Sequence, residues 1–558
     1  MKKACVAVVL LLLLTPLAGS TGHASGAATA APLGSQFRDM PSLANISSFI
    51  HALPAGMDIL GTAQQANLTM ELVQATGNID MLLRDNETWL EDAVVSFYRL
   101  HNITVSQTAQ QQFFQQTEAM PDALRKAVAM LLVTLNQATV LARQATQNLS
   151  ADERTYLSRH NQSETDLGDL VRNTLAQRLN ILPDVSLFQS NTSYLFSLIE
   201  KIDTEKLVEG SLQMVRAVRI ATPVIAGSAG YNTTLRDPSG YICIGGSGND
   251  THTGEAALCV DVGGDDIYTT RGYGEAALCV DVGGSDRYQG KTASSFLGIG
   301  MHFDIAGNDV YQTGNWSQSY ACGGVTFMMD VGGDDSYHAG DHAQACAHAG
   351  GIALMVDTGG TDRYHAGNRS QGCSNANAVA LLLDIAGDDV YVGGSYVQGS
   401  ATAGGIALLL DCLGDDQYRS GSNAQGAGEG WTTGLKKMST GLMVDVMGND
   451  RYEAAAHAQG YGTLAGVGCL TDLLGADTYT ATRASQSHGT LFGIAMLMDF
   501  ERDNIFSQQF PSPGGSEGGT SIHIDDIDAL PSDAILDLLS YVRDHNIMPL
   551  SSFLELLG

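Results

Sequence analysis

Apolar residues follow two different spacings along this chain of 558 residues. From about residue 37 to 225 they recur every three or four positions, as in 123–147 and 167–182, which is the spacing of amphipathic helices. The segment 150–153 reads Ser-Ala-Asp-Glu, a capping box that is typical of a helix N-terminus. We therefore expect an α-helical domain over 35–227, arranged as a bundle or as an elongated arm.

Beyond Gly227 the apolar residues fall into short runs bounded by glycine, such as 352–356 and 406–410. These runs are too short for helices and favour buried β-strands. Each run precedes a D-x-x-G-x-D-x-Y motif, which first occurs at 261–268 and ends as a degenerate copy at 499–506. The spacing between copies settles at 27 residues, which indicates an array of one structural unit.

A coil of about 27 residues is long enough for three strands and three corners at roughly 3.3 Å per residue. The sequence therefore predicts a three-sided parallel β-solenoid over 241–510, with successive coils about 4.8 Å apart. An insertion near 429–438 should bulge from one corner, and a linker with short helices follows over 511–558. The predicted fold class is α+β and multidomain: a helical region, a solenoid and a short helical tail.

Stacking of the coils would place each motif position in a row. We expect the first aspartate of the motif, the outer row, to shape its own turn by accepting backbone N–H groups. We expect the glycine that follows it, as in Gly264, Gly333 and Gly387, to adopt positive φ. The outer row comprises Asp261, Asp281, Asp304, Asp330, Asp357, Asp384, Asp411, Asp445, Asp472 and Asp499.

The second aspartate of the motif makes an inner row. Carboxylates about 4.8 Å apart repel by roughly 1 kcal/mol in water and by several times that at lower dielectric, so the row requires protons, hydrogen-bond donors or cations. Calcium suits it, because calcium takes carboxylate and carbonyl oxygens in flexible geometry. The inner row comprises Asp250, Asp266, Asp286, Asp309, Asp335, Asp362, Asp389, Asp416, Asp450 and Asp477.

The segment 245–253 matches G-G-x-G-x-D-x-U-x except for His252 at the large apolar position. It resembles the calcium-binding nonapeptide of β-roll toxins and secreted proteases. The resemblance implies that inner aspartates and turn carbonyls of successive coils hold calcium. Those proteins repeat every nine residues, whereas this chain has one such turn in each 27. Hydrogen-bonded turns without metal are the alternative.

Glutamine, tyrosine and cysteine also recur in register. The tyrosines predict a packing stack, and the glutamines predict an amide ladder between coils. Cys243, Cys259 and Cys279 share one register and Cys346 and Cys373 another, so they are disulfide candidates or buried free thiols. We expect no zinc site, because the sequence has no C-x-x-C motif and no evident His/Cys cluster. The glutamines are Gln318, Gln344, Gln371, Gln398, Gln425, Gln459 and Gln486.

The first 30 residues predict export. Two lysines precede the apolar run 4–14, and small residues follow, which favours a signal peptide cleaved after Ala24 or Ala30. No later segment is apolar for about 18 residues, so we expect no membrane span in the mature protein. Asn-x-Ser/Thr sequons are candidate glycosylation sites in an exported chain. They are Asn45, Asn67, Asn86, Asn102, Asn148, Asn161, Asn191 and Asn232 before the repeats, and Asn249, Asn315 and Asn368 within them.

The net charge and the regularity of the repeats argue against some classes of function. A net charge of -31 argues against a nucleic-acid partner. The same residues recur with no break that would mark a nucleophile, a base and an oxyanion hole, so we expect no enzyme. The signal, the sequons and the acidic Gly/Ala/Asp-rich repeats together resemble cell-envelope sheath proteins of filamentous methanogenic archaea.

The sheath resemblance implies a structural subunit of a tubular, amyloid-like extracellular sheath or cell wall layer. Its partners would be further copies of itself and other envelope components, and calcium would stabilise it. The alternative is a monomeric secreted calcium-binding adhesin or binding module. A polysaccharide-active β-helix enzyme is a third option, because parallel β-helices also support lyases.

Overall fold

The computed structural model describes residues 89–162, 193–430, 438–500, 504–508, 516–517 and 519–525. The predicted signal peptide, the helix at 167–182, most of the insertion near 429–438 and the helical tail lie outside these residues. By internal contacts the chain divides into two compact units. Among the described residues, the helix-bearing unit comprises those up to Thr358 and Ala376–Val379, and the second unit comprises Gly359–Asn375 and those from Ala380 onward.

The helical pattern upstream of the repeats is confirmed. Ser150 and Glu153 form the predicted capping box, since the backbone N–H of each donates to the side chain of the other, at 2.8 and 3.3 Å. The helices are α6 (Trp89–Leu100), α7 (Gln107–Thr117), α8 (Asp122–Ala145), α9 (Ala151–Gln162) and α12 (Thr204–Ala226).

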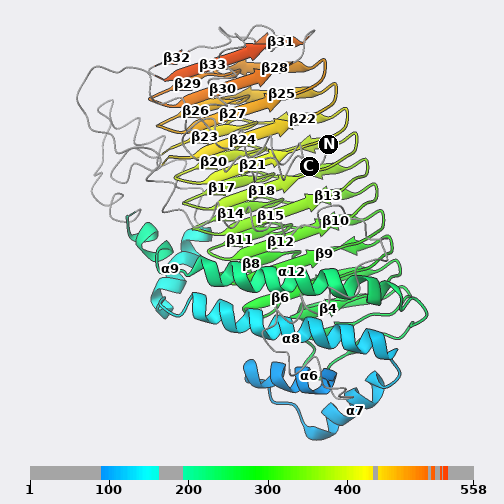
Figure 1. Ribbon diagram of the computed structural model, residues 1–558. Helices are drawn as coiled ribbons and strands as arrows, with labels where there is room; N and C mark the ends of the chain where they lie inside the picture. Colours follow the sequence, from blue (N-terminus) through cyan, green and yellow to red (C-terminus); the bar gives the residue numbers. More distant parts are fainter. Residues whose placement is uncertain are drawn as a thin grey trace, which may run out of the picture. The chain divides into compact units, whose positions relative to one another are not determined.

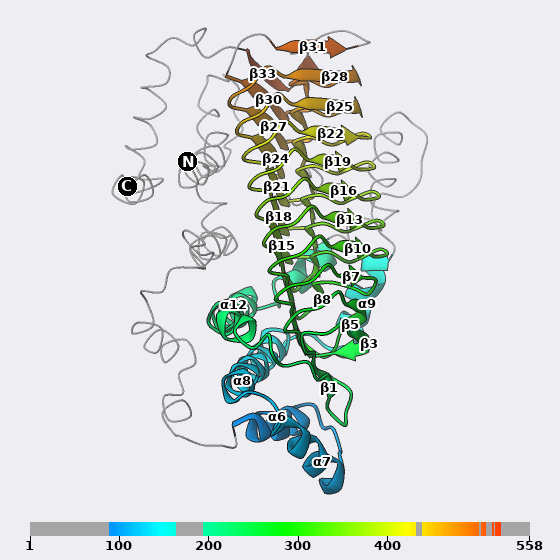
Figure 2. The same ribbon diagram turned by 90° about the vertical axis from the view of Figure 1, so that its right-hand side faces the viewer.

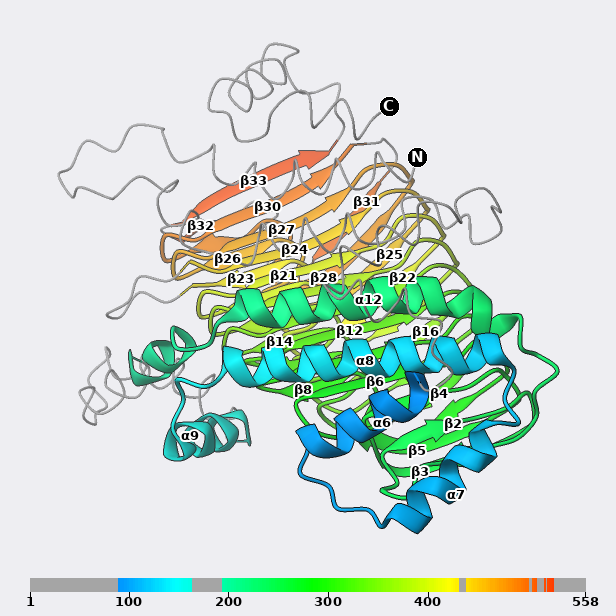
Figure 3. The same ribbon diagram turned by 60° about the horizontal axis from the view of Figure 1, so that its bottom comes forward.

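Helices α8 and α12 lie side by side across the first strands of the solenoid (Figures 1 and 3). Gly210 of α12 permits this close approach, because a Cβ there would lie 2.9 Å from Ile299 Cδ1 and 3.3 Å from Ala138 Cα. Among the described helices, α8 alone has the length and apolarity of a membrane span, but most of its apolar stretch is buried inside the unit. A core helix passes the same test.

In the helix-bearing unit the strands form three sheets, and all neighbouring strands pair in parallel except β1 with β2. The first sheet contains β1 (Leu235–Arg236), β2 (Ile242–Ile244), β4 (Leu258–Val260), β6 (Ala276–Val280), β9 (Ile299–Phe303), β12 (Val325–Asp330) and β15 (Ile352–Asp357). The second contains β3 (Thr251–Ala256), β5 (Ile267–Gly272), β7 (Arg287–Tyr288), β10 (Val310–Gln312) and β13 (Ser336–His338). The third contains β8 (Ser294–Phe296), β11 (Tyr320–Cys322) and β14 (Cys346–His348).

The second unit repeats the arrangement, and its strands stack in even steps (Figure 2). The first-sheet strands are β18 (Val379–Leu383), β21 (Ile406–Leu410), β24 (Thr440–Asp445), β27 (Val467–Asp472), β30 (Ile494–Asp499) and β33 (Thr520–Asp525). The second-sheet strands are β16 (Arg363–His365), β19 (Val390–Val392), β22 (Gln417–Ser420), β25 (Arg451–Ala456), β28 (Thr478–Arg483) and β31 (Ile505–Gln508). The third-sheet strands are β17 (Cys373–Asn375), β20 (Ser400–Thr402), β23 (Ala427–Glu429), β26 (Tyr461–Thr463), β29 (Gly489–Thr490) and β32 (Ser516–Glu517).

The register follows the sequence repeat. Equivalent residues pair directly, as Tyr391 does with Tyr418 and Asp445 with Asp472. First-sheet strands such as β24 and β27 are buried along their whole length, which explains why these runs are apolar without alternation. The predicted parallel β-solenoid with coils of about 27 residues is therefore confirmed.

Candidate functional site: the buried aspartate and tyrosine rows

Each outer aspartate lies at the turn that follows a first-sheet strand, and its side chain is buried. As predicted, Oδ1 accepts the backbone N–H two residues further on, at 2.9 Å in Asp261 and 3.0 Å in Asp281. Asp304, Asp330 and Asp384 make the same bond at 3.2–3.3 Å. The outer row thus shapes its turns over part of its length, because Oδ1 of Asp411, Asp445 and Asp472 lacks this donor.

The second oxygen of each outer aspartate binds the preceding coil. Except in Asp261, Oδ2 accepts the hydroxyl of that coil's motif tyrosine, as in Tyr311 to Asp330 at 2.7 Å. In the second unit five such bonds measure 2.6–2.8 Å. They join Tyr364 to Asp384, Tyr391 to Asp411, Tyr418 to Asp445, Tyr452 to Asp472 and Tyr479 to Asp499.

The tyrosines also form the predicted packing stack. Ring centroids of successive tyrosines in the second unit lie 4.6–5.0 Å apart, and the rings are nearly parallel. Phe506 ends the stack against Tyr479 at 4.7 Å. The stack buries each ring, while each hydroxyl is satisfied by an aspartate.

The inner aspartates link the coils in a second way. The backbone N–H of one inner aspartate donates to Oδ1 of the next, as Asp286 does to Asp309 and Asp389 to Asp416, both at 2.6 Å. A distance of 2.6 Å is short for a bond from a backbone N–H to a carboxyl oxygen. Oδ2 has no N–H or hydroxyl donor in several members of the row: Asp266, Asp286, Asp309, Asp389 and Asp450.

The turn geometry brings outer and inner aspartates into common clusters. In one cluster a carboxylate oxygen from each of Asp266, Asp281 and Asp286 lies within 4.8 Å of the other two, and all three residues are buried. The next coils repeat this arrangement with Asp286, Asp304 and Asp309, and then with Asp309, Asp330 and Asp335. The sequence predicted one row of aspartates that shapes turns and another that binds metal. In the structure the two rows contribute carboxyls to the same clusters.

Burial makes these carboxyls hold protons. Burial first, and the charge of Asp384 next, raise the pKa of Asp389 to about 10. Burial likewise raises the pKa of Asp309 to about 9 and that of Asp450 to about 7. Each cluster therefore needs a proton or a cation to stay buried.

The motif glycine is required for close stacking of the turns, and the predicted positive φ is confirmed at two of the three positions named for it. Gly264 and Gly333 have φ of 136° and 157°, but Gly387 does not have positive φ, so that prediction is wrong there. A Cβ on Gly387 would lie 1.9 Å from the carbonyl oxygen of Gly360. The contact in Gly333 is closer still, at 1.4 Å from Gly307 O. The turns stack backbone on backbone, and only glycine fits.

The glutamine row is buried and reinforces the second sheet. Each amide donates to the carbonyl of its own coil's motif tyrosine at 3.0–3.4 Å. Most also donate to a backbone carbonyl of the next coil, as Gln398 does to Arg419 O at 3.2 Å. The predicted amide-to-amide bond is present between Gln344 and Gln318 and between Gln398 and Gln371.

The cysteine register is confirmed for Cys243, Cys259 and Cys279, which pair directly on β2, β4 and β6. The three cysteines are free thiols in this structure, so they are aligned as predicted but not bridged, and their oxidation in solution stays a prediction. Cys346 begins β14 in the helix-bearing unit and Cys373 begins β17 in the second unit; both side chains are buried.

Of the sequons before the repeats, Asn102, Asn148 and Asn232 are exposed, as glycosylation requires. The side chains of Asn45, Asn67, Asn86, Asn161 and Asn191 lie outside the described residues. The sequon asparagines within the repeats hydrogen-bond to the backbone of the next coil. Asn315 Oδ1, for example, accepts the N–H of Asp341 at 3.0 Å.

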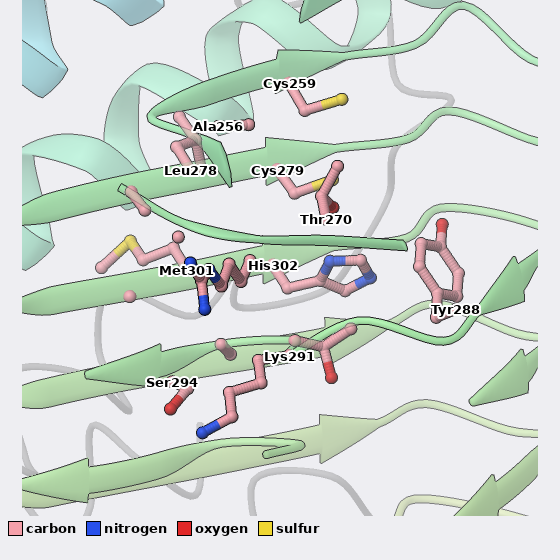
Figure 4. Close-up of a pocket in the computed structure, with 16 residues that line it drawn as sticks. Ala256, Cys259, Thr270, Leu278, Cys279, Tyr288, Lys291, Ser294, Met301 and His302 are labelled. Carbon is pink, nitrogen blue, oxygen red and sulfur yellow. The ribbon is translucent and has the colours of Figure 1, made fainter. Parts of the chain in front are cut away.

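A small cavity of about 40 Å³ opens beside the tyrosine stack in the helix-bearing unit. Figure 4 shows Cys259, Cys279 and His302 on successive first-sheet strands, with Tyr288 beyond the imidazole. His302 is buried, and burial lowers its pKa to about 3, so the ring is neutral. The cavity has room for a water molecule beside His302 Nε2, which has no protein partner.

Searches of family models, of curated proteins and of solved structures each found no match to this chain.

Proposed function

We propose that this chain is a structural protein of the cell exterior, a self-associating subunit of a sheath or another envelope layer. The observation that carries the proposal is the regularity of the buried rows within each unit. The same tyrosine–aspartate bond joins coil to coil from Tyr268 to Asp357 in the helix-bearing unit and from Tyr364 to Asp499 in the second unit. A reaction site needs local differences, whereas this repetition adds rigidity with every coil.

Self-association is supported by the last coils. Phe492 is 81% exposed and Ile505 is 61% exposed, and Leu491 and Ile522 are also exposed. Large apolar side chains exposed on several connections and strands of the last described coils favour contact with another chain. A strand at the end of a solenoid carries backbone groups that a further strand can pair with. The partner that fits both features is a second copy of this chain.

Calcium belongs to the same proposal. The clusters place two or three buried carboxyls around each gap between coils, and Oδ2 of Asp286 and Asp309 faces its cluster with no N–H or hydroxyl donor. Calcium binds carboxylate oxygens and would replace the protons that the clusters otherwise hold. The outer aspartates Asp281 and Asp304 would then contribute together with the inner row.

Export, glycosylation and a three-sided cross-section complete the proposal. The N-terminal sequence pattern and the exposed sequons support an extracellular location. Three sheets in each unit support a three-sided coil. Other envelope components are the further partners, and no reaction is assigned to the chain.

The proposal is tested by sedimentation of the mature chain at high concentration, with calcium. We expect large assemblies from the native chain and loss of these assemblies in Phe492→Asp. Phe296→Asp is the matched control, because Phe296 is also exposed, at 42%, but lies on β8 of the helix-bearing unit. We expect this control to assemble like the native chain.

A native chain that stays monomeric with calcium at high concentration would contradict the proposal. If that monomer still binds calcium, the secreted adhesin or binding module becomes the better explanation. Cleavage of a polysaccharide by the monomer would instead favour the β-helix enzyme.

A further inference from the structure

The first coil of the solenoid departs from the repeat at several positions. His252 occupies the place of the motif tyrosine, since it pairs with Tyr268 in register. Gly245 stands where later coils have the outer aspartate. Cys243 and Cys259 lie two residues before that position, where every motif coil of the second unit has Leu or Met, although His523 pairs there on the final strand β33. Those equivalents are Leu382, Leu409, Met443, Leu470 and Leu497.

These departures meet at one point. One ligand atom from each of Cys243, His252 and Cys259 lies within 4.8 Å of the other two. The three side chains are each 2% exposed. Cys243 and Cys259 are directly paired on β2 and β4, and His252 reaches them from β3 of the second sheet. No local sequence motif indicates this cluster, because its members do not have C-x-x-C spacing. They come together only because successive coils stack.

A carboxylate orients the His252 ring, as is common for histidines that bind metals. Its Nε2 lies 2.7 Å from Oδ2 of Asp261, a buried residue. The other carboxyl oxygen of Asp261, Oδ1, accepts the backbone N–H of Gly263. A carboxylate on one ring nitrogen fixes the ring and leaves the other nitrogen, Nδ1, for the two thiols. Carboxylate–histidine–metal chains have this arrangement. Later coils place a tyrosine hydroxyl on the equivalent aspartate, and a phenol there has no second ligand atom to offer.

We propose that Cys243, His252 and Cys259 bind one thiophilic d10 metal ion, copper(I) or zinc(II), at the first coil. Two thiolates and an imidazole are soft or borderline ligands that select these ions over calcium or magnesium. Cys279 pairs with Cys259 but lies two strands from Cys243, so it flanks the three-ligand set. A bound ion would join β2, β3 and β4 at the point where the repeat begins. This site is distinct from the carboxyl clusters and does not depend on the proposed sheath role.

The test is metal titration of the reduced, chelator-treated full chain. Copper(I) is added against bicinchoninate and zinc(II) against a chromophoric chelator. Cobalt(II) replaces zinc in a third sample to report thiolate ligation by near-ultraviolet charge-transfer absorption. We expect about one equivalent to bind in the copper or the zinc arm, and the stronger arm identifies the ion.

Variants locate the site. Cys243→Ser and Cys259→Ser should each weaken binding at least about tenfold. Cys469→Ser, a buried cysteine of the second unit, should leave binding unchanged. His252→Tyr restores the residue of the repeat and should fold with native circular dichroism while weakening binding at least about tenfold.

Two results would overturn the proposal. One is binding by the native chain that is no tighter than binding by His252→Tyr. The other is a Cys243–Cys259 disulfide, found by mass spectrometry after alkylation of the unreduced chain, because it would leave no thiolates for a metal.

Discussion

The aspartate–tyrosine pair is the smallest unit of this solenoid. Asp411, for example, lies fully buried and accepts the hydroxyl of Tyr391 at 2.8 Å. The hydroxyl of Tyr391 also lies 3.0 Å from Oδ2 of Asp384 in its own coil. The hydroxyl therefore supplies a donor to carboxyls that burial would otherwise leave short of partners.

Tyr391→Phe should destabilise the folded chain by about 1–3 kcal/mol, because Oδ2 of Asp411 loses its donor in a dry site. The stacked ring stays in place, so the loss reports the hydroxyl. Tyr194→Phe, at a side chain that is 41% exposed, should change stability by no more than about 0.5 kcal/mol. Urea denaturation of the three proteins measures both. Equal stability of native and Tyr391→Phe would show that the bond contributes nothing.

Much of this residue-level chemistry could be predicted from the repeat, but the partners could not. Periodicity alone indicated which aspartates share a row and that tyrosines stack. It could not show that Tyr391 bonds to an aspartate 20 residues later, because that contact depends on how side chains cross the interior. For the same reason His252 was recognised only as an exception to a motif, and its contact with two cysteines was missed.

At the scale of the element, the turn after each first-sheet strand is the tightest part of the coil. Turns of successive coils contact each other through backbone, with no room for a side chain. The sequence indicated a glycine at this place for its φ, yet Gly387 shows that close approach is the general cause. Coil-to-coil distance is a property of the stack, so a single turn could not reveal it.

Gly333→Ala should destabilise the chain by at least about 2 kcal/mol, because its Cβ would meet Gly307 O at 1.4 Å and the backbone must shift. Gly314→Ala is the matched control in the same unit. A Cβ there has nothing within 4 Å, so its stability should stay within about 0.5 kcal/mol of native. Thermal denaturation followed by circular dichroism compares them, and similar losses in both would refute close stacking.

At the scale of the whole molecule, the two rows of buried aspartates bind protons more tightly than aspartates in water do. Carboxyls such as Asp330 and Asp389 have folded pKa values of about 7 and about 10, raised chiefly by burial. In an unfolded chain the pKa of aspartate is about 3.9. The folded state therefore keeps protons that the unfolded state releases.

Stability without cations should be highest below about pH 4 and should fall as the pH rises through the folded pKa values. Each retained proton costs about 1.4 kcal/mol per pH unit in this range. We expect the melting temperature in EGTA to be lower at pH 9 than at pH 7, and calcium to reduce the difference by replacing protons. Magnesium is the control, because it demands stricter octahedral geometry and binds such clusters less well. A melting temperature that rises with pH in EGTA would contradict the proton account, and one that calcium leaves unchanged would leave the rows as protonated hydrogen-bonded turns.

The fold of the repeats followed from their period, and the helices upstream followed from their apolar spacing. What the sequence could not supply was the packing of α8 and α12 on the first strands, which depends on Gly210 lying close to both Ala138 and Ile299. These contacts join segments far apart in the chain, and no local pattern marks them.

The central claim is that this solenoid is a building unit of a layer outside the cell. Electron cryo-tomography of the native cell surface, with gold-labelled antibody against the chain, tests it most directly. The account predicts label along an ordered tube, fibre or sheet. Label confined to dispersed single molecules, or to the surrounding medium, would contradict it.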